Sequence, residues 1–225
     1  MDSQSILKRL KELADPSVLD GMSRYGINTS KALGVTIPKI RFLAKEMGKD
    51  HELALELWSI DFHETKFLAS MIDDPQMLTS EQMEEWAKDF DSWDVCDQTC
   101  NNLFRKSSLA FDKSFEWCKK NEEFVKRAGY VLMANLAVHD KNRKDEDFLN
   151  FFPEIYNGSI DDRIYVKKAV NWALRQIGKR SLFLNKKAIE CANDIQKIDS
   201  KYARWIATDA LRELKNPKIV ERIKK

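Results

Sequence analysis

The sequence of 225 residues has few helix-breaking residues and no long apolar run. Its seven glycines and five prolines leave little room for a turn-dense β fold. No stretch approaches the roughly 18 consecutive apolar residues that a membrane-spanning helix needs. The start, residues 1–5, lacks the basic and apolar regions of a signal peptide. We therefore expect a cytoplasmic protein with no membrane partner. Because no linker or low-complexity segment divides the chain, we expect one domain over residues 1–225.

The cysteines and histidines show no metal-ligand spacing. Only Cys96 and Cys100 lie close together, four residues apart, and the three histidines are scattered. Thiols packed among helices are typical of a reduced compartment. We therefore expect neither a metal nor a cofactor, with a zinc site as the less favoured alternative.

The charge is divided unevenly along the chain. Residues 1–100 hold 11 Lys and Arg against 19 Asp and Glu, a net −8, whereas residues 101–225 hold 27 against 17, a net +10. A basic C-terminal half indicates contact with a polyanion, although lysine-rich helix faces are also commonly just solvated. The total of +2 argues against a protein that coats nucleic acid indiscriminately.

Apolar residues recur with helical spacing along almost the whole chain, which predicts an all-α fold. Thr79-Ser80-Glu81-Gln82 is a candidate capping box at a helix start. Short connections make successive helices antiparallel, so we expect an α-solenoid, with an irregular bundle as the alternative because no repeat of fixed period is visible. The later helices are expected over residues 91–105, 108–119, 122–138, 145–155, 160–178, 184–197 and 200–214.

The most informative motif is Ser92–Asp97, in which Trp93 and Asp97 are four residues apart. On a helix these positions share one face. An aromatic wall beside a fixed negative charge suits a cation, or a sugar that becomes cationic. For an isolated pair, a core tryptophan and a solvated aspartate are the simpler alternative.

A second motif combines an aromatic residue with cations. Lys168, Trp172, Arg175 and Lys179 fall on one helical stripe. Burying unpaired cations is costly, so the stripe should face solvent or a ligand. A nucleotide base or sugar beside phosphates would explain a tryptophan there. The alternative is that Trp172 lies at the edge of the core, under the alkyl stems of the cations.

Two further residues are ambiguous from sequence alone. Arg127 opens an apolar run and suits either a surface ion pair or a phosphate clamp, and the residue pattern favours the ion pair. Tyr25 follows Arg24 where a helix ends, and a lone tyrosine there is more typical of packing.

The order and spacing of these elements resemble the AlkD-like DNA alkylation repair enzymes, which are small DNA glycosylases built from HEAT-like helical pairs. The resemblance covers about residues 20–215, and no single motif would suffice for it. It is carried by Tyr25 before Leu33-Gly34-Val35-Thr36-Ile37-Pro38, then Leu57-Trp58, Trp93-Asp94-Val95-Cys96-Asp97, Lys126-Arg127-Ala128 and Lys168-Ala169-Val170-Asn171-Trp172-Ala173-Leu174-Arg175.

The resemblance implies a C-shaped solenoid with a concave basic face for duplex DNA. It implies hydrolytic release of N3- and N7-alkylated purines, such as 3-methyladenine and 7-methylguanine, without base flipping. A monomer that binds alkylated duplex DNA is expected, at the nucleoid if the source is bacterial. The implied catalytic residues are Asp97, Trp93 and Trp172. The implied DNA contacts are Arg127, Tyr25, Lys168, Arg175 and Arg204.

The chain also departs from the family pattern. Ser92 stands where relatives often carry a second tryptophan, and the charged stretch 141–147 is longer than expected. Two alternatives therefore stay open beside the glycosylase. One is a non-catalytic solenoid that binds distorted or branched duplexes, and the other is a protein-binding scaffold.

Overall fold

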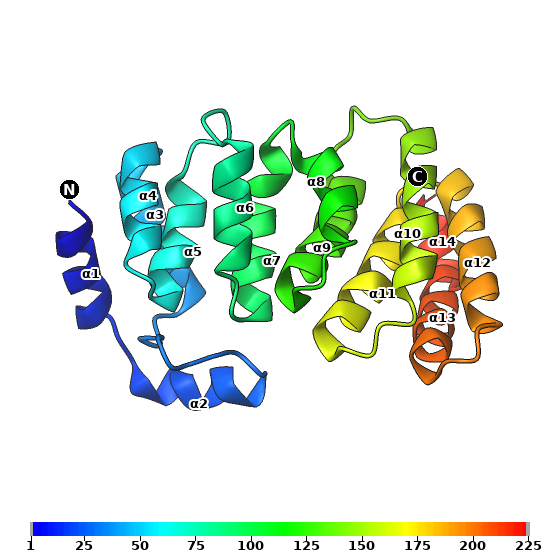
Figure 1. Cartoon of the computed structure of the whole chain (residues 1–225), viewed down its shortest axis with the longest axis horizontal. Coiled ribbons are helices and arrows are strands. Elements are labelled where there is room, and N and C mark those ends of the chain that lie inside the picture. Colours follow the sequence, from blue (N-terminus) through cyan, green and yellow to red (C-terminus); the bar gives the residue numbers. More distant parts are fainter. Residues whose placement is uncertain (1, 224–225) are drawn as a thin grey trace. The chain divides into compact units, whose positions relative to one another are not determined.

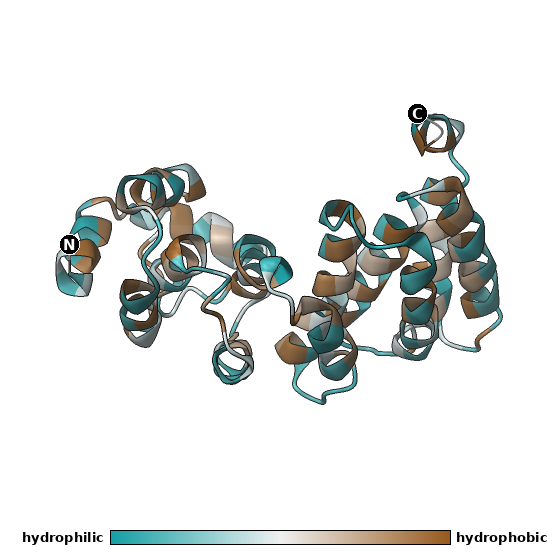
Figure 2. Ribbon diagram, turned by 90° about the horizontal axis from the view of Figure 1, so that it is seen from above, coloured by the Kyte–Doolittle hydropathy of each residue, from teal (hydrophilic) through white to brown (hydrophobic). Residues whose placement is uncertain are grey.

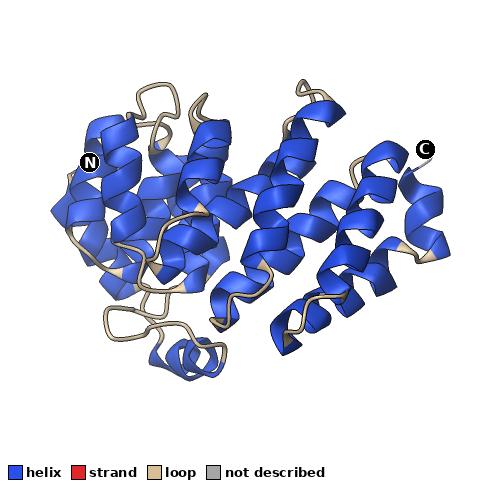
Figure 3. Cartoon of the chain, turned by 45° about the vertical axis from the view of Figure 1, so that its right-hand side comes forward, coloured by secondary structure: helices blue, strands red, loops and turns tan. Residues whose placement is uncertain are grey.

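The computed structural model describes residues 2–223, and these residues form helices and loops with no β-strand among them (Figure 3). The predicted all-α fold is therefore confirmed. The helices carry both apolar and polar residues, brown and teal in Figure 2, as amphipathic helices do. Within the described part of the chain, no helix combines the length and the apolar character that crossing a membrane requires.

The chain divides into two compact units, Met1–Ser108 (unit 1) and Leu109–Lys225 (unit 2). The single domain expected over residues 1–225 stays a prediction. The helices of unit 1 are α1 (Ser3–Glu12), α2 (Pro16–Arg24), α3 (Ile37–Met47), α4 (His51–Ser59), α5 (His63–Ile72), α6 (Ser80–Lys88), α7 (Trp93–Asn102) and the short 3-10 helix η1 (Phe104–Lys106). Those of unit 2 are α8 (Ala110–Trp117), α9 (Glu123–His139), the 3-10 helix η2 (Asp145–Asn150), α10 (Phe151–Gly158), α11 (Ile164–Gly178), α12 (Leu182–Gln196), α13 (Lys201–Leu214) and α14 (Pro217–Ile223).

Helix α5 lies at the centre of unit 1, where it packs against α3, α4 and α7 (Figure 1). Every residue of α5 except Met71 is buried, including the polar residues His63, Glu64 and Lys66. A buried polar group is costly unless it is hydrogen-bonded. The polar side chains of α5 therefore have to find partners on neighbouring segments.

Helix α11 has the same central place in unit 2, where it packs against α9, α10, α12 and α13. Asn171 Nδ2 donates to Asp209 Oδ2 at 2.7 Å, and Arg175 Nη1 donates to Glu213 Oε2 at 2.5 Å. Both pairs are 38 residues apart, so α11 and α13 run parallel, with α12 returning the chain between them. Within each unit this is the layering of a helical-repeat fold.

The predicted helix over residues 145–155 is wrong as a single α-helix. The structure has the 3-10 helix η2 up to Asn150, and α10 begins only at Phe151. The reason is Pro153, which lacks an N–H and is tolerated only in the first turn of an α-helix. The helix predicted from residue 160 likewise begins at Ile164, after a turn in which Asp161 accepts a bond from the Arg163 N–H at 3.1 Å.

The predicted helix start at Thr79 is confirmed. Thr79 is the N-cap of α6, and its hydroxyl accepts a bond from the Gln82 N–H at 3.1 Å. The reciprocal half of the capping box is absent, because Gln82 Nε2 donates to Asp73 Oδ2 at 2.7 Å instead. A buried carboxylate on the neighbouring turn takes the side chain that would otherwise complete the box.

Candidate functional site

Buried hydrogen bonds fix the start of α7, the helix that carries Trp93 and Asp97. Asp94 accepts bonds from Ser92 Oγ at 2.6 Å and from the Val95 N–H at 2.9 Å. Its other carboxylate oxygen lies 2.8 Å from Nε2 of His63 on α5. Ser92, Asp94 and His63 are all buried. These bonds therefore anchor the first turn of α7 to the centre of unit 1.

The ionised form of Asp94 is favoured by this arrangement. Burial alone would raise the pKa of Asp94, but the hydrogen bond and charge of His63 and the bonds from Ser92 and Val95 outweigh it. The net result is a pKa below the ordinary value of 3.8. Asp94 is thus an anionic anchor inside unit 1, beside the candidate catalytic residues rather than among them.

Trp93 and Asp97 are one turn apart on α7, and both are half-buried. Their spacing puts them on one face of the helix. Trp93 Nε1 donates to the backbone oxygen of Tyr25 at 3.0 Å, which joins the start of α7 to the end of α2. The Tyr25 side chain is 76% exposed, so its interpretation as a packing residue is wrong. Unit 1 therefore brings Tyr25 and Trp93 together, with Asp97 one turn further along.

Glu64 is an anchor in unit 1 that sequence reasoning missed. Its carboxylate is fully buried and accepts bonds from three successive N–H groups, those of Leu33, Gly34 and Val35, at 2.8–3.1 Å. Such a row of N–H groups is a backbone anion nest. Glycine at position 34 permits this nest, because its φ is +79° and a Cβ there would lie 2.2 Å from the backbone oxygen of Asp15. Glu64 thereby fixes the loop before α3.

In unit 2, Arg127 is only 5% exposed. Its Nη1 donates to the backbone oxygen of Tyr165 at 2.5 Å, which ties α9 to the first turn of α11. The interpretation of Arg127 as a surface residue is therefore wrong. A phosphate has access only to the small exposed part of Arg127. The contact of Arg127 with DNA phosphate stays a prediction.

The predicted cationic stripe on α11 is partly neutralised within unit 2. Lys168 is exposed and Trp172 is half-buried. Arg175 and Lys179, however, each lie 2.5 Å from a different carboxylate oxygen of Glu213 on α13. Their positive charge is therefore shared with an acid of the same unit. The half-buried state of Trp172 agrees with a place at the edge of the core, and its contact with a nucleotide stays a prediction.

Arg204, on α13, is exposed and forms an ion pair with Asp199 at 3.0 Å. The next residue, Trp205, is 42% exposed and was not singled out from the sequence. Nζ of Lys167, on α11, lies 4.7 Å from the centroid of the Trp205 ring. The sequence does carry a signal for Trp205, because the run Lys201-Tyr202-Ala203-Arg204-Trp205 places cations directly before or near aromatic residues.

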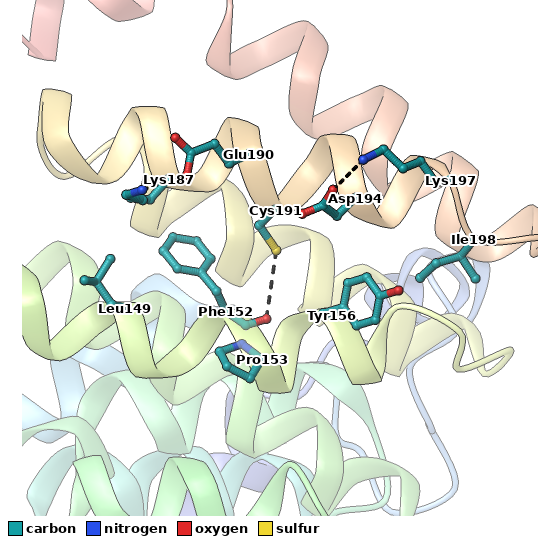
Figure 4. A pocket seen from close by; sticks show the side chains of 10 residues that line it. All are labelled: Leu149, Phe152, Pro153, Tyr156, Lys187, Glu190, Cys191, Asp194, Lys197 and Ile198. Carbon is teal, nitrogen blue, oxygen red and sulfur yellow. Dashed lines mark hydrogen bonds and ion pairs between the residues drawn. The ribbon is translucent and has the colours of Figure 1, made fainter.

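A surface groove of about 730 Å³ lies between α10 and α12 and contains none of the predicted site residues. Phe152 and Tyr156 of α10 face Cys191 of α12 across it (Figure 4). Burial raises the pKa of the Cys191 thiol to about 12, with a smaller contribution from Asp194. The thiol is therefore protonated at neutral pH and is a poor nucleophile. Among the described residues, no group of three or more His, Cys, Asp or Glu side chains is placed to hold a metal ion.

The residues on α7 can stabilise positive charge. A half-buried carboxylate attracts a cation more strongly than an exposed one does, since less water screens it. The indole face of Trp93 adds a quadrupole attraction for the same charge. Tyr25, whose backbone oxygen binds Trp93, has an exposed side chain, which suits contact with a large ligand. A carboxylate and an indole on one helix face have the chemistry to stabilise a reacting centre that becomes cationic.

The comparisons with known proteins agree with this reading of the fold. The sequence matches the family described as DNA alkylation repair enzyme over residues 6–214. A similar solved structure has a TM-score of 0.77 and 19% sequence identity, and the match covers 95% of this chain and 96% of that one. That protein is described as a member of a new family related to the HEAT-like repeat DNA glycosylases, with affinity for branched DNA structures. No curated protein matches the chain.

Proposed function

The chain belongs to the DNA alkylation repair enzyme family, and from this we propose that it excises cationic N3- and N7-alkylated purines from duplex DNA. The observation that carries the proposal is the half-buried pair of Trp93 and Asp97 on one face of α7. The first turn of α7 is anchored to α5 through Asp94, and Trp93 binds the backbone oxygen of the exposed Tyr25.

We propose that Asp97 stabilises the transition state of N-glycosidic hydrolysis. An alkylated purine already carries a positive charge, and it leaves with the electrons of the glycosidic bond as a neutral base. Positive charge then develops on the deoxyribose, and water adds to C1′ and loses a proton. A carboxylate next to that carbon lowers the barrier by electrostatic stabilisation and can orient the water. The Trp93 indole supports the same charge through its ring face.

The other predicted residues are proposed to hold the DNA. Tyr25 and Lys168 are exposed and available for backbone contact. Trp172 is proposed to contact the DNA through its ring, and Arg127 through a phosphate. Arg175 and Arg204 have carboxylate partners, Glu213 and Asp199, with which phosphate contacts would compete. We therefore expect these two arginines to contribute less than Lys168.

The proposal is tested by incubating the protein with methylated duplex DNA and measuring free 7-methylguanine and 3-methyladenine. Release well above the spontaneous rate is expected. A duplex that carries a neutral base adduct serves as the matched control and should be a poor substrate, because selectivity depends on the positive charge of the leaving base. Release no faster than in buffer would exclude the glycosylase.

A second candidate is a non-catalytic protein that binds branched DNA. It is favoured by the description of the similar solved structure, which names affinity for branched DNA. Under this alternative, binding to a four-way junction persists and no base is released. A protein-binding scaffold is distinguished by salt, since phosphate contacts make DNA affinity fall steeply as salt is raised.

A further inference from the structure

The first halves of α11 and α13 carry a surface patch whose residues have no role in the proposed function. We define the Trp205 patch as Lys167, Lys201, Tyr202 and Trp205. Nζ of Lys167 lies 4.7 Å from the Trp205 ring centroid and 5.6 Å from that of Tyr202. Nζ of Lys201 lies 5.1 Å from the Tyr202 ring centroid. Two rings and two ammonium groups thus share one surface.

The parallel packing of α11 and α13 explains why these residues meet. Lys167 and Trp205 are 38 residues apart, as are Asn171 and Asp209. Trp205 and Asp209 are one turn apart on α13, and each faces a residue of α11. Asp209 binds Asn171 through its carboxylate, whereas Trp205 presents its ring to Lys167. An indole therefore stands where the next turn of α13 has an acid.

The lysines of the patch keep their positive charge because Trp205, and not an acid, stands beside them. Arg175, in the last turn of α11, and Lys179, its C-cap residue, share Glu213. Among the described residues, by contrast, neither Lys167 nor Lys201 has a carboxylate within ion-pair distance. Lys168 beside them is exposed and has no carboxylate partner within the part of the chain that the structure describes.

The acids in the loops before the two helices, apart from Asp162, are paired with cations outside the patch. Asp161 binds Arg163 at 2.6 Å and Lys126 at 3.2 Å. Asp199 binds Arg204, which leaves Asp162 as an exposed acid in the loop before α11.

An exposed tryptophan flanked by lysines has the chemistry of a base-stacking site. Aromatic side chains bind unpaired bases through their ring faces, and neighbouring cations bind the phosphates on either side. We propose that the Trp205 patch binds an unpaired DNA base by stacking on Trp205, with Lys167 and Lys201 on the adjoining phosphates. Bases inside an uninterrupted duplex are already stacked on one another, so the patch is selective for DNA with a single-stranded arm. The inference rests on the proposed function only in taking DNA as the ligand.

The test compares two fluorescein-labelled probes at one salt concentration, a fork with a single-stranded thymidine arm and a fully paired duplex. The wild-type protein should bind the fork more tightly. Trp205→Ala should weaken fork binding by about tenfold, within the usual range for losing a stacked base, and leave duplex binding unchanged. Trp205→Phe should retain most of the fork affinity. The matched control is Phe183→Ala on α12, because Phe183 is also 42% exposed and should not affect either probe.

The lysines are tested through salt dependence. For a single-stranded probe, the slope of log affinity against log salt falls by about 0.7 for each phosphate contact that is lost. Lys167→Ala and Lys201→Ala should each show this change, and Lys187→Ala in the groove between α10 and α12 should not. Slopes equal to that of the wild type in both patch variants would remove the lysines from the proposal.

Two results would overturn the proposal that the Trp205 patch binds an unpaired base. In one, Trp205→Ala lowers the unfolding midpoint while fork affinity stays that of the wild type, which means that Lys167 only covers an apolar ring. In the other, Trp205→Ala weakens fork and duplex binding equally. Base release from methylated duplex separates this inference from the proposed function. A protein that releases no base but loses its fork preference in Trp205→Ala keeps the patch and loses the glycosylase.

Discussion

The two units use their charged residues in different ways. In unit 1, bonds between neighbouring layers join residues about 31 positions apart, and the acceptors are the buried carboxylates of Glu64 and Asp94. In unit 2 the corresponding bonds between α11 and α13 join residues 38 positions apart. A half-buried acid, Glu213, pairs there with Arg175 of α11 and with Lys179, which caps the end of that helix. In these contacts the acids of unit 1 are internal anchors, whereas Glu213 of unit 2 is a partner of half-buried cations.

The difference shows why the charge of each half says little about its surface. The net −8 of residues 1–100 includes carboxylates that bind backbone N–H groups inside the unit. The net +10 of residues 101–225 includes Arg175 and Lys179, which are paired with Glu213. Among the residues that the structure describes, the cations without a carboxylate partner include Lys167, Lys168 and Lys201. A charge count therefore indicates a polyanion partner without locating its binding surface.

The largest effect that the comparison predicts is on stability. Glu64→Ala leaves three N–H groups of the nest without their acceptor, and it should lower the free energy of unfolding by about 3 kcal/mol or more. Glu213→Ala in unit 2 removes a half-buried partner and should cost about 1 kcal/mol. Urea denaturation of the two variants measures both values. The comparison fails if Glu213→Ala is the more destabilising change.

Arg127→Ala should have the next largest effect, this time on the DNA contact proposed for unit 2. Loss of a charge-assisted hydrogen bond to phosphate should weaken duplex binding about 10- to 100-fold, and excision should fall with it. Fluorescence anisotropy with a methylated duplex measures the affinity. Equal affinities of variant and wild type would remove Arg127 from the site and leave it a structural role, in which it binds the backbone oxygen of Tyr165.

Trp172→Ala distinguishes a ligand contact from a core residue. If the Trp172 ring contacts the DNA as proposed, its loss should lower excision about tenfold, the scale of one lost aromatic contact to a base. Trp172 is only half-buried, so its removal leaves no large cavity in the core. The melting temperature should change little. A large drop in melting temperature with an unchanged excision rate would assign Trp172 to the core and weaken the account of unit 2.

The smallest effect concerns acid stability in unit 1. The pKa of Asp94 is lower in the folded protein than its ordinary value of 3.8. The stability that Asp94 contributes is therefore present above about pH 4 and is lost as pH falls through the folded pKa. The urea midpoint of Asp94→Asn should be lower than that of the wild type at pH 6 and converge with it at acid pH. A constant difference between the two proteins across that range would contradict the anchor role.

The helical fold could be predicted from the sequence because apolar spacing and helix caps are local signals. The start at Thr79 and the end of α2 at Arg24 are examples. The helix starts at residues 145 and 160 were misjudged, because Pro153 and the Asp161 turn override the apolar pattern there. A repeat of fixed period could not be found, since the spacing between equivalent residues differs between the two units.

The candidate site was only partly predictable. The shared face of Trp93 and Asp97 follows from their spacing within one helix. The burial of Arg127 does not, because it depends on Tyr165, which is 38 residues away. Glu64 carried no signal at all, since the N–H groups that it binds are about 30 residues earlier in the chain. Contacts between layers therefore decide which polar residues are anchors and which are open to a ligand.

The central claim, that the reaction depends on Asp97, is tested most directly by the single-turnover rate of 7-methylguanine release. Asp97→Asn should lower this rate about 100-fold or more at saturating protein while duplex affinity persists, the scale of losing a preorganised electrostatic group. Glu85→Gln is the matched control, because Glu85 is an exposed acid on α6, and it should keep the wild-type rate. An Asp97→Asn variant that releases 7-methylguanine as fast as the wild type would contradict the account.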